Sequence, residues 1–198
     1  MKSDNSWKIK RGNIKYYNAT AHSYNCQYQE EQFRKYKIAL NSLKISRNNS
    51  ILDVGCGTGL LIKEFTETAS FVVGIDLSKK MIKIAKEKFR EYKNVFLICG
   101  DADHLSLREK IIDKVFSFTL LQNMPDIQKT TREILRVAKM NSKIILSINK
   151  KSFTKKEFLK RLREVNITIT NFIDDKDLKD YLAICTKVSK KVPLKGEE

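Results

Sequence analysis

The 198-residue chain is predicted to adopt an α/β fold, with a mostly parallel sheet between two layers of helices. Two observations predict this fold. Short apolar runs alternate with amphipathic segments from residue 51 to residue 148, which is the pattern of β–α–β units. A glycine-rich turn directly follows the first apolar run, and a strand, a glycine turn and a helix together bring backbone N–H groups to a ligand. The length corresponds to a single domain with a full core.

The first predicted strand is the apolar run 51–54, and the turn after it contains Gly55, Gly57 and Gly59. Glycine suits such a turn because a Cβ atom would hold the ligand away and would resist the backbone angles of a tight bend. The spacing Gly-x-Gly-x-Gly differs from the Gly-x-Gly-x-x-Gly of dinucleotide-binding proteins. An amphipathic helix is predicted to follow near residues 59–67.

Two carboxylates accompany this turn. Asp53 lies two residues before the first glycine, where it would repel a pyrophosphate and attract an ammonium group. Asp76 ends the second predicted strand, 71–75, where a carboxylate can accept both hydroxyl groups of a ribose. A ligand with an amino group, a carboxylate and a ribose, but without phosphate, is S-adenosylmethionine.

Four motifs occur in order: Asp-Val-Gly-Cys-Gly-Thr-Gly at 53–59, Gly-Ile-Asp-Leu-Ser at 74–78, Gly-Asp-Ala-Asp at 100–103 and Asp-Lys-Val-Phe-Ser at 113–117. Through these motifs the stretch 51–148 resembles the class I S-adenosylmethionine-dependent methyltransferases with a type 11/25-like core. The resemblance implies a Rossmann-like, seven-stranded, mostly parallel sheet, helices on both faces, and a C-terminal antiparallel hairpin. It implies S-adenosylmethionine as cofactor, bound by Asp53, Gly55, Cys56, Gly57, Asp76, Leu77, Asp101, Ala102 and Thr119.

By the same resemblance, Asp101 accepts a hydrogen bond from the adenine amino group and the backbone N–H of Ala102 donates to the adenine ring. The alternative for Asp101 is a turn residue, because Gly-Asp is a common turn signal.

The remaining elements follow from hydrophobic periodicity and turn residues. Ser78 and Asp126 are predicted to cap the helices that follow them. Helices are expected near 30–43, 79–91, 126–139 and 153–164, and strands at 94–98, 114–118, 143–148, 165–173 and 181–188. We expect an N-terminal arm with helices at 1–45, the methyltransferase core at 46–190 and a disordered tail at 191–198.

The N-terminal region is predicted to cover the cofactor site. Residues 1–13 are expected to form a loosely ordered basic arm, in which Trp7 either stacks on a base or packs on the core. Residues 14–28 resemble the segment that folds over the cofactor in many of these methyltransferases. Tyr17 is the leading candidate for an aromatic lid residue, and Tyr24 is the next.

The methyl acceptor should approach past residues 119–126, at the end of the fourth strand of the core. Asn123 and Pro125 partly match the Asn/Asp/Ser-Pro-Pro-aromatic tetrad of enzymes that methylate exocyclic base amines, so Asn123, Pro125 and Tyr17 are the predicted catalytic residues. An Asn side-chain oxygen could there accept from the amine. The alternative is that Pro125 and Asp126 only start a helix, as in small-molecule methyltransferases.

The net charge of +16 and the sequence pI near 9.7 favour a polyanionic partner, and nucleic acid is the commonest. A drift in composition toward lysine would also raise the pI. The predicted helix 153–164 carries many basic residues, which indicate phosphate contacts or simply a solvated face. The predicted nucleic-acid-binding residues are Lys10, Arg11, Lys151, Lys155, Lys156, Lys160 and Arg161.

The leading expectation is therefore a methyltransferase that modifies a nitrogen of ribosomal or transfer RNA, for example cytosine N4. A small-molecule methyltransferase of the quinone-biosynthesis type and a non-catalytic S-adenosylmethionine-binding subunit are the alternatives. No metal is expected. The absence of a membrane span and of a signal peptide predicts a cytoplasmic protein. RNA recognition is expected to use the N-terminal arm, the surface beside the cofactor or an activating partner protein.

Overall fold

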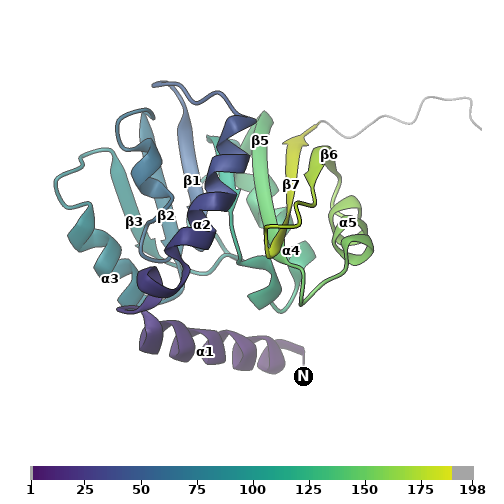
Figure 1. Cartoon of the computed structure of the whole chain (residues 1–198), viewed down its shortest axis with the longest axis horizontal. Helices are drawn as coiled ribbons and strands as arrows, with labels where there is room; N and C mark the ends of the chain where they lie inside the picture. Colours follow the sequence, from purple (N-terminus) through teal and green to yellow (C-terminus); the bar gives the residue numbers. More distant parts are fainter. Residues whose placement is uncertain (1, 189–198) are drawn as a thin grey trace, which may run out of the picture.

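The computed structural model describes residues 2–188 and contains one seven-stranded sheet (Figure 1). The strands lie in the order β3-β2-β1-β4-β5-β7-β6. Strands β1 to β5 pair in parallel, and β7 is antiparallel to both β5 and β6. The predicted mostly parallel sheet with a C-terminal antiparallel hairpin is therefore confirmed. The bounds are β1 Ser50–Val54, β2 Phe71–Asp76, β3 Val95–Cys99, β4 Ile112–Ser117, β5 Ala138–Asn149, β6 Ile167–Ile173 and β7 Asp180–Lys187.

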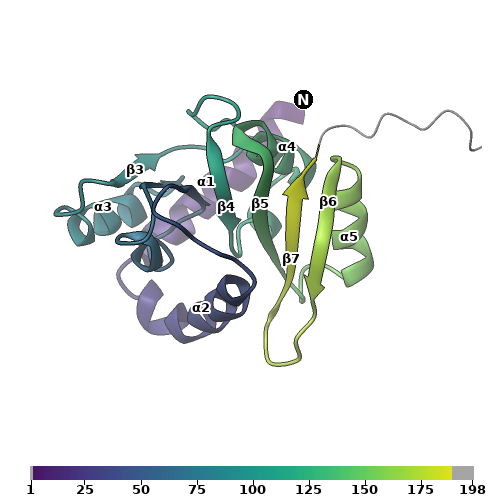
Figure 2. The ribbon, with the colours of Figure 1, turned by 90° about the horizontal axis from the view of Figure 1, so that it is seen from above.

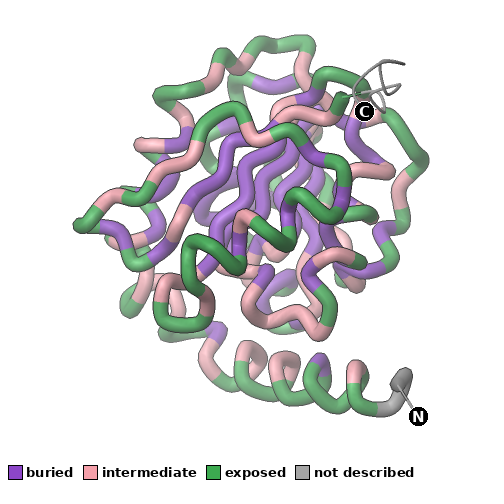
Figure 3. The backbone as a smooth tube through the Cα atoms, turned by 90° about the vertical axis from the view of Figure 1, so that its right-hand side faces the viewer, coloured by how far each residue is buried: buried purple, intermediate pink, exposed green. Residues whose placement is uncertain are grey.

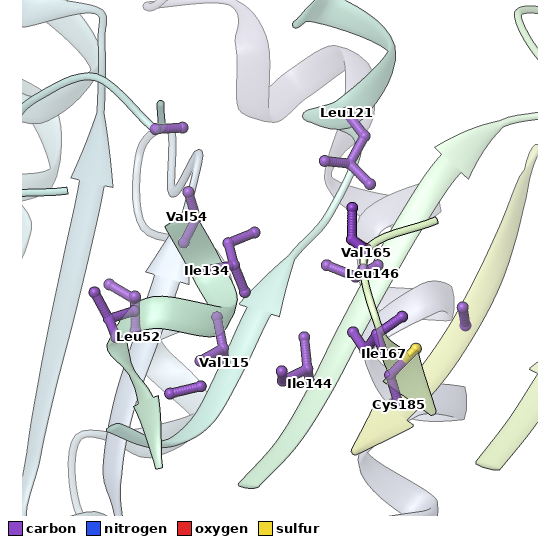
Figure 4. Close-up of a cluster of buried hydrophobic side chains, with 14 of the residues drawn as sticks. Leu52, Val54, Val115, Leu121, Ile134, Ile144, Leu146, Val165, Ile167 and Cys185 are labelled. Carbon is purple, nitrogen blue, oxygen red and sulfur yellow. The ribbon is translucent and has the colours of Figure 1, made fainter. Parts of the chain in front are cut away.

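Helices cover both faces of the sheet and enclose two apolar cores (Figures 1 and 2). One face packs against α2 (Tyr24–Asn41), the short 3₁₀ helix η1 (Ile62–Phe65) and α3 (Lys79–Lys88). The other face packs against α4 (Ile127–Val137) and α5 (Lys155–Arg163). Figure 4 shows this second core, where Ile134 of α4 meets Leu52 and Val115 from the strands.

The helices that follow β2 and β4 begin at side-chain caps, as predicted. The Ser78 hydroxyl accepts from the Met81 N–H at 3.2 Å, and the Asp126 carboxylate accepts from the Lys129 N–H at 3.0 Å. Each cap satisfies a backbone donor that the helix itself leaves free. The confirmed cap at Asp126 supports the alternative in which this residue starts a helix.

The helix predicted near residues 59–67 is wrong, because this segment forms a turn and only the 3₁₀ helix η1. Leu60, Leu61 and Ile62 are all buried. Three consecutive buried side chains cannot share one face of an α-helix, whose buried positions are spaced three or four residues apart. Because all three side chains of this apolar stretch are buried, the segment does not form the predicted amphipathic helix.

The loosely ordered arm predicted for residues 1–13 is also wrong, since α1 runs from Lys2 to Thr20 as one helix. It lies apart from both helical layers, below the carboxyl ends of the parallel strands (Figures 1 and 3). The helix predicted at 30–43 is part of the longer α2. The tail predicted at 191–198 lies outside the described residues. Within residues 2–188, no helix has the length and apolar character needed to cross a bilayer.

Candidate functional site

A pocket lies between the carboxyl ends of the parallel strands and helix α1. Its walls come from the ends of β1, β2 and β4, and β1 lies between the other two. In open α/β sheets, this reversal of strand order is where ligands bind. The space within the pocket and its open mouth amounts to about 740 Å³.

The residues predicted to bind the cofactor gather around this pocket. Cys56 and Asp53 line a smaller adjoining cavity, which shares Gly55 and Gly57 with the main pocket. The predicted residues that line the main pocket itself are Gly55, Gly57, Asp76, Leu77, Asp101, Ala102 and Thr119.

The glycines of the turn have different tasks. Gly57 has φ of 54°, and a Cβ atom on it would meet no atom within 4 Å and would project into open space. Gly57 therefore keeps the backbone accessible to a ligand. Gly59 has φ of 76°, and a Cβ atom there would approach the Phe89 ring to 2.5 Å. The third glycine thus serves close packing against the end of α3.

Asp76 is held in place by the backbone on both sides. Its two carboxylate oxygens accept from the N–H of Gly57 at 2.9 Å and from the N–H of Ser78 at 2.8 Å. Burial raises the pKa of Asp76, and these two hydrogen bonds counteract the rise. The carboxylate lines the pocket with its position fixed, as a group that binds ribose hydroxyls requires.

Asp53 is buried without a positive partner. Its residue is 4% exposed, and within residues 2–188 no cationic side chain lies within ion-pair distance of the carboxylate. Burial, followed by repulsion from Asp76, raises the pKa of Asp53 to about 8. A buried carboxylate of this kind fits the ammonium group of an amino acid, which would supply the missing charge. The cavity therefore fits the methionine end of S-adenosylmethionine.

Asp101 has a positive partner, which is Lys10 of α1. The Lys10 ammonium donates to both oxygens of Asp101, at 2.8 and 2.7 Å, and also to Asp103. Lys10 is 5% exposed, so the prediction that it contacts phosphate is corrected. Burial lowers the pKa of Lys10, but the hydrogen bonds and charges of the two carboxylates outweigh burial and raise it. Trp7 is half-exposed, and its ring centroid lies 5.6 Å from the same ammonium.

Further along α1, two asparagines attach the helix to the pocket walls. The Asn13 amide donates to the backbone carbonyl of Asn123 at 2.7 Å. The Asn18 side-chain oxygen accepts from the Ser78 hydroxyl at 2.7 Å. Helix α1 is thus held by side chains at the ends of β2, β3 and β4, and it covers the pocket.

Two of the three predicted catalytic residues meet at the β4 end of the pocket. The Asn123 amide donates to the Tyr17 hydroxyl at 2.9 Å, and both residues line the pocket with Tyr24. Burial raises the pKa of Tyr17 and of Tyr24, so both phenols stay protonated. Pro125, the third predicted catalytic residue, does not line the pocket.

The other predicted nucleic-acid-binding residues lie on the surface. Arg11 is exposed on α1, and Lys151 is exposed just before α5. Helix α5 lies beside β6, three strands beyond β4 in the sheet (Figure 2). Its exposed basic residues, Lys155, Lys156, Lys160 and Arg161, are therefore separated from the pocket by the width of those strands.

Sequence reasoning missed the residues that fasten α1 and α2 to the strand ends. Asn13, Asn18 and Lys35 had no predicted role, and Lys35 is fully buried. The available signal was spacing: Gln32, Lys35, Tyr36 and Ala39 share one helical face. A lysine on the buried face of a helix requires a buried carboxylate as partner.

Comparison with known proteins finds similarity to methyltransferases. Residues 52–146 match a family model described as a methyltransferase domain. The chain is 29% identical over 181 residues to the uncharacterized protein MJ1252 of Methanocaldococcus jannaschii, covering 86% of this chain and 69% of that protein. It is 32% identical over 114 residues to the demethylmenaquinone methyltransferase of Shouchella clausii, covering 55% of this chain and 48% of that enzyme. The aligned stretch thus spans about half the length of this curated relative.

Solved structures share the fold at low sequence identity. Magnesium protoporphyrin IX methyltransferase from Synechocystis PCC 6803, solved with bound S-adenosylmethionine, superposes with a TM-score of 0.77 and 18% identity, covering 90% of this chain and 97% of that one. A complex of a putative methyltransferase with the Trm112 methyltransferase activator of Haloferax volcanii superposes with a TM-score of 0.75 and 16% identity, covering 87% of this chain and 98% of that one.

Proposed function

We propose that this protein is a class I S-adenosylmethionine-dependent methyltransferase and that it methylates a small aromatic acceptor bound between the strand ends and helix α1. The observation that carries this proposal is the contact between Tyr17 of α1 and Asn123 at the end of β4. This contact lies at the acceptor end of the pocket, beside the residues that would hold the cofactor.

The cofactor, when bound, supplies an electrophilic methyl group. Asp53 would hold its ammonium group, Asp76 its ribose, and the loop with Ala102 its adenine. Asp53 gains the positive partner that its burial requires, and α1 limits the access of water to the reacting groups. Alignment of the acceptor and exclusion of water are the main tasks of the protein in such a transfer.

The acceptor end of the pocket offers one hydrogen-bond acceptor and one donor. The Asn123 amide nitrogen donates to the Tyr17 hydroxyl and to the Thr119 carbonyl, at 2.9 and 3.2 Å. Among residues 2–188, no group donates to the Asn123 side-chain oxygen, and the Tyr17 O–H has no acceptor. This pair fits a polar substituent on a ring that packs against Tyr24 and Phe118.

The same site contains no side chain suited to act as a general base. The two carboxylates that line the main pocket are Asp76 and Asp101, and both already accept hydrogen bonds at the cofactor end. The two tyrosines are protonated. The acceptor must therefore be nucleophilic before it loses a proton, as a ring carbon of an electron-rich hydroquinone is. That carbon would bond to the methyl group as the sulfur–methyl bond breaks, and its ring proton would then pass to solvent. The similarity to demethylmenaquinone methyltransferases supports this class.

The proposal is tested by supplying radiolabelled S-adenosylmethionine with chemically reduced demethylmenaquinone, with simple aromatic amines and with total cellular RNA in separate reactions. Label in the hydroquinone or amine product, identified by mass spectrometry, is the expected result. Label found in RNA alone would overturn the proposal.

Two variants connect such activity to the site. Tyr17→Phe removes the free O–H donor and keeps the ring, and Asn123→Ala removes the free acceptor oxygen. Each should lower kcat about 10- to 100-fold with cofactor affinity retained, since both side chains lie at the acceptor end of the pocket. The exposed neighbour Tyr16 provides the matched control Tyr16→Phe, which should leave kcat unchanged.

RNA is the second candidate acceptor, and the specific observation in its favour is charge. The exposed basic residues of α5 and the net charge of +16 would attract a phosphate backbone. Reversal of charge at Lys155, Lys156, Lys160 and Arg161 should then abolish RNA binding, and the affinity of the unmodified protein should fall steeply with salt. Copurification of an activating subunit would extend this test, since the Haloferax volcanii neighbour is bound to one.

A further inference from the structure

Thr119 has an unusual backbone conformation at the point where β4 leads into the acceptor site. Its φ is 56°, in the left-handed region, although its side chain is β-branched. Such a residue is strained and persists only where its surroundings hold it. Thr119 also lines the pocket, so the strain occurs next to the proposed acceptor.

A buried polar network holds the Thr119 side chain. The Thr119 hydroxyl accepts from the Lys35 ammonium at 2.7 Å and donates to the Asp180 carboxylate at 3.0 Å. Lys35 and Asp180 form an ion pair of 3.0 Å in which both side chains are fully buried. Lys35 comes from α2 and Asp180 is the first residue of β7, so elements far apart in sequence meet at this threonine.

The same network fixes the backbone of Thr119, and this backbone in turn contacts Asn123. The Thr119 N–H donates to the Ser147 hydroxyl at 2.8 Å, and that hydroxyl donates to Asp180 at 2.8 Å. The Thr119 carbonyl in turn accepts from the Asn123 amide at 3.2 Å. A change at the ion pair would therefore move the carbonyl that orients Asn123.

We infer that Lys35, Asp180 and Thr119 are positioning residues, which set the orientation of the Asn123 side chain for methyl transfer. The inference rests on the proposed acceptor site at Asn123. With its amide nitrogen engaged by Thr119 and Tyr17, the Asn123 oxygen is left to face the acceptor.

Stability alone gives a weak reason for the ion pair. Replacing a buried pair by apolar side chains of similar size is often neutral or stabilising, because both charges must be desolvated. A strained threonine held by that pair beside a pocket indicates a functional role, since backbone strain collects at sites whose geometry matters.

The test uses the side-chain amide signals of Asn123 in the full chain, which are recorded by NMR and assigned as the pair missing from Asn123→Asp. Thr119→Val keeps the branched shape and removes the hydroxyl, whereas Thr119→Ser keeps the hydroxyl. We expect Thr119→Val to shift the Asn123 signals and to speed their hydrogen exchange about tenfold, as loss of one hydrogen bond would. Thr119→Ser should restore both properties.

Lys35→Met should move the same signals in the same direction, and the exposed Lys37 of the same helix gives the control Lys37→Met. If Lys35→Met fails to fold, the comparison of Thr119→Val with Thr119→Ser decides the question. Unchanged Asn123 signals in Thr119→Val, or equal changes in the valine and serine variants, would overturn the inference. This readout needs no acceptor, so it remains informative even if the proposed substrate class is wrong.

Discussion

The two ends of the pocket use buried carboxylates in opposite ways. Asp53, at the end that fits the methionine part of the cofactor, has no positive partner, and burial raises its pKa to about 8. Asp101, at the adenine end, accepts two hydrogen bonds from the Lys10 ammonium of α1. Asp53 therefore lacks a positive partner, which a ligand could supply, whereas Asp101 already has a positive partner within the protein.

This difference gives the two carboxylates separate roles: Asp53 would select the ligand, and Asp101 would keep the pocket covered by α1. A cation is required at Asp53, so ligands without an amino group should lose affinity there. At Asp101 the positive partner is Lys10 of α1, and this ion pair therefore holds the helix over the pocket. Because its oxygens already accept from Lys10, the adenine amino group would have to share or displace this contact.

The largest effect is expected from Asp53→Asn, which keeps the size of the side chain and removes its charge. Loss of one partner of a buried ion pair costs about 2 to 5 kcal/mol, or about 30- to 5000-fold in Kd. Isothermal titration with S-adenosylhomocysteine, which has the same amino acid group, measures this loss. The stability of the cofactor-free protein at pH 7 should hardly change, since Asp53 with a pKa of about 8 is mostly neutral there.

5′-Methylthioadenosine is the matched control ligand, because it retains the adenosine part and lacks the amino acid. Its affinity should be the same for Asp53→Asn as for the unmodified protein. An equal loss of affinity for both ligands would show that the substitution disturbs the pocket as a whole and that Asp53 does not recognise an ammonium group.

An effect of comparable size, on the attachment of α1 and not on cofactor affinity, is expected from Lys10→Met, which removes the charge that neutralises Asp101 and Asp103. Breaking a buried pair in this way costs about 3 to 5 kcal/mol, which should release α1 from the pocket. Hydrogen exchange of the α1 amides should accelerate strongly, while the amides of β1 and β4 stay protected. Lys8→Met, at an exposed position of the same helix, should have no such effect.

A smaller and more specific effect is the release of a proton on cofactor binding. In the free protein the pKa of Asp53 is raised from 3.8 to about 8, so at pH 7 the folded state holds a proton that the unfolded chain has lost. Stability of the free protein should thus fall as pH rises from about 4 to about 8. An ammonium group favours the carboxylate, so binding should release close to one proton at pH 7 and strengthen from pH 6 to 8.

Titrations in buffers with different ionisation enthalpies measure this proton directly. Asp53→Asn should abolish the release, and Lys10→Met should leave it intact. Release of the same proton by the Asp53→Asn protein would assign it to another group, for example Asp76, whose pKa burial also raises.

The sheet, and the gathering of the motif residues around one pocket, were predictable from the sequence for a local reason. The apolar runs alternate with helical segments, and Asp53, Asp76 and Asp101 each lie at or just after the carboxyl end of a strand. Asp53, Asp76 and Asp101 therefore reach the same edge once the strands are parallel. Placement of these residues needs only the strand assignments and their order.

The helical structure of residues 2–13 was not predictable in the same way, because the inner side of α1 is polar. Lys10, Asn13 and Asn18 face the pocket walls, so α1 shows no apolar stripe that periodicity could detect. Lys10 even indicated a phosphate contact, since a lysine in a basic segment is usually exposed. Its partners Asp101 and Asp103 are about ninety residues away in the chain, and only the folded arrangement brings them together.

The smallest effect is expected from Asn18→Ala, near the C-terminal end of α1, whereas Lys10 lies at the middle of the helix. It removes two neutral hydrogen bonds, one from the Ser78 hydroxyl at 2.7 Å and one from the Lys80 backbone N–H at 3.2 Å, each of which is worth about 1 kcal/mol. Hydrogen exchange should then accelerate only in the last turns of α1, and the exposed Lys15 gives the control Lys15→Ala. If Asn18→Ala released the whole helix as Lys10→Met does, the ion pair would not be the principal anchor. The role assigned to Asp101, which is to hold α1 over the pocket, would then be wrong, and its contrast with Asp53 would no longer stand.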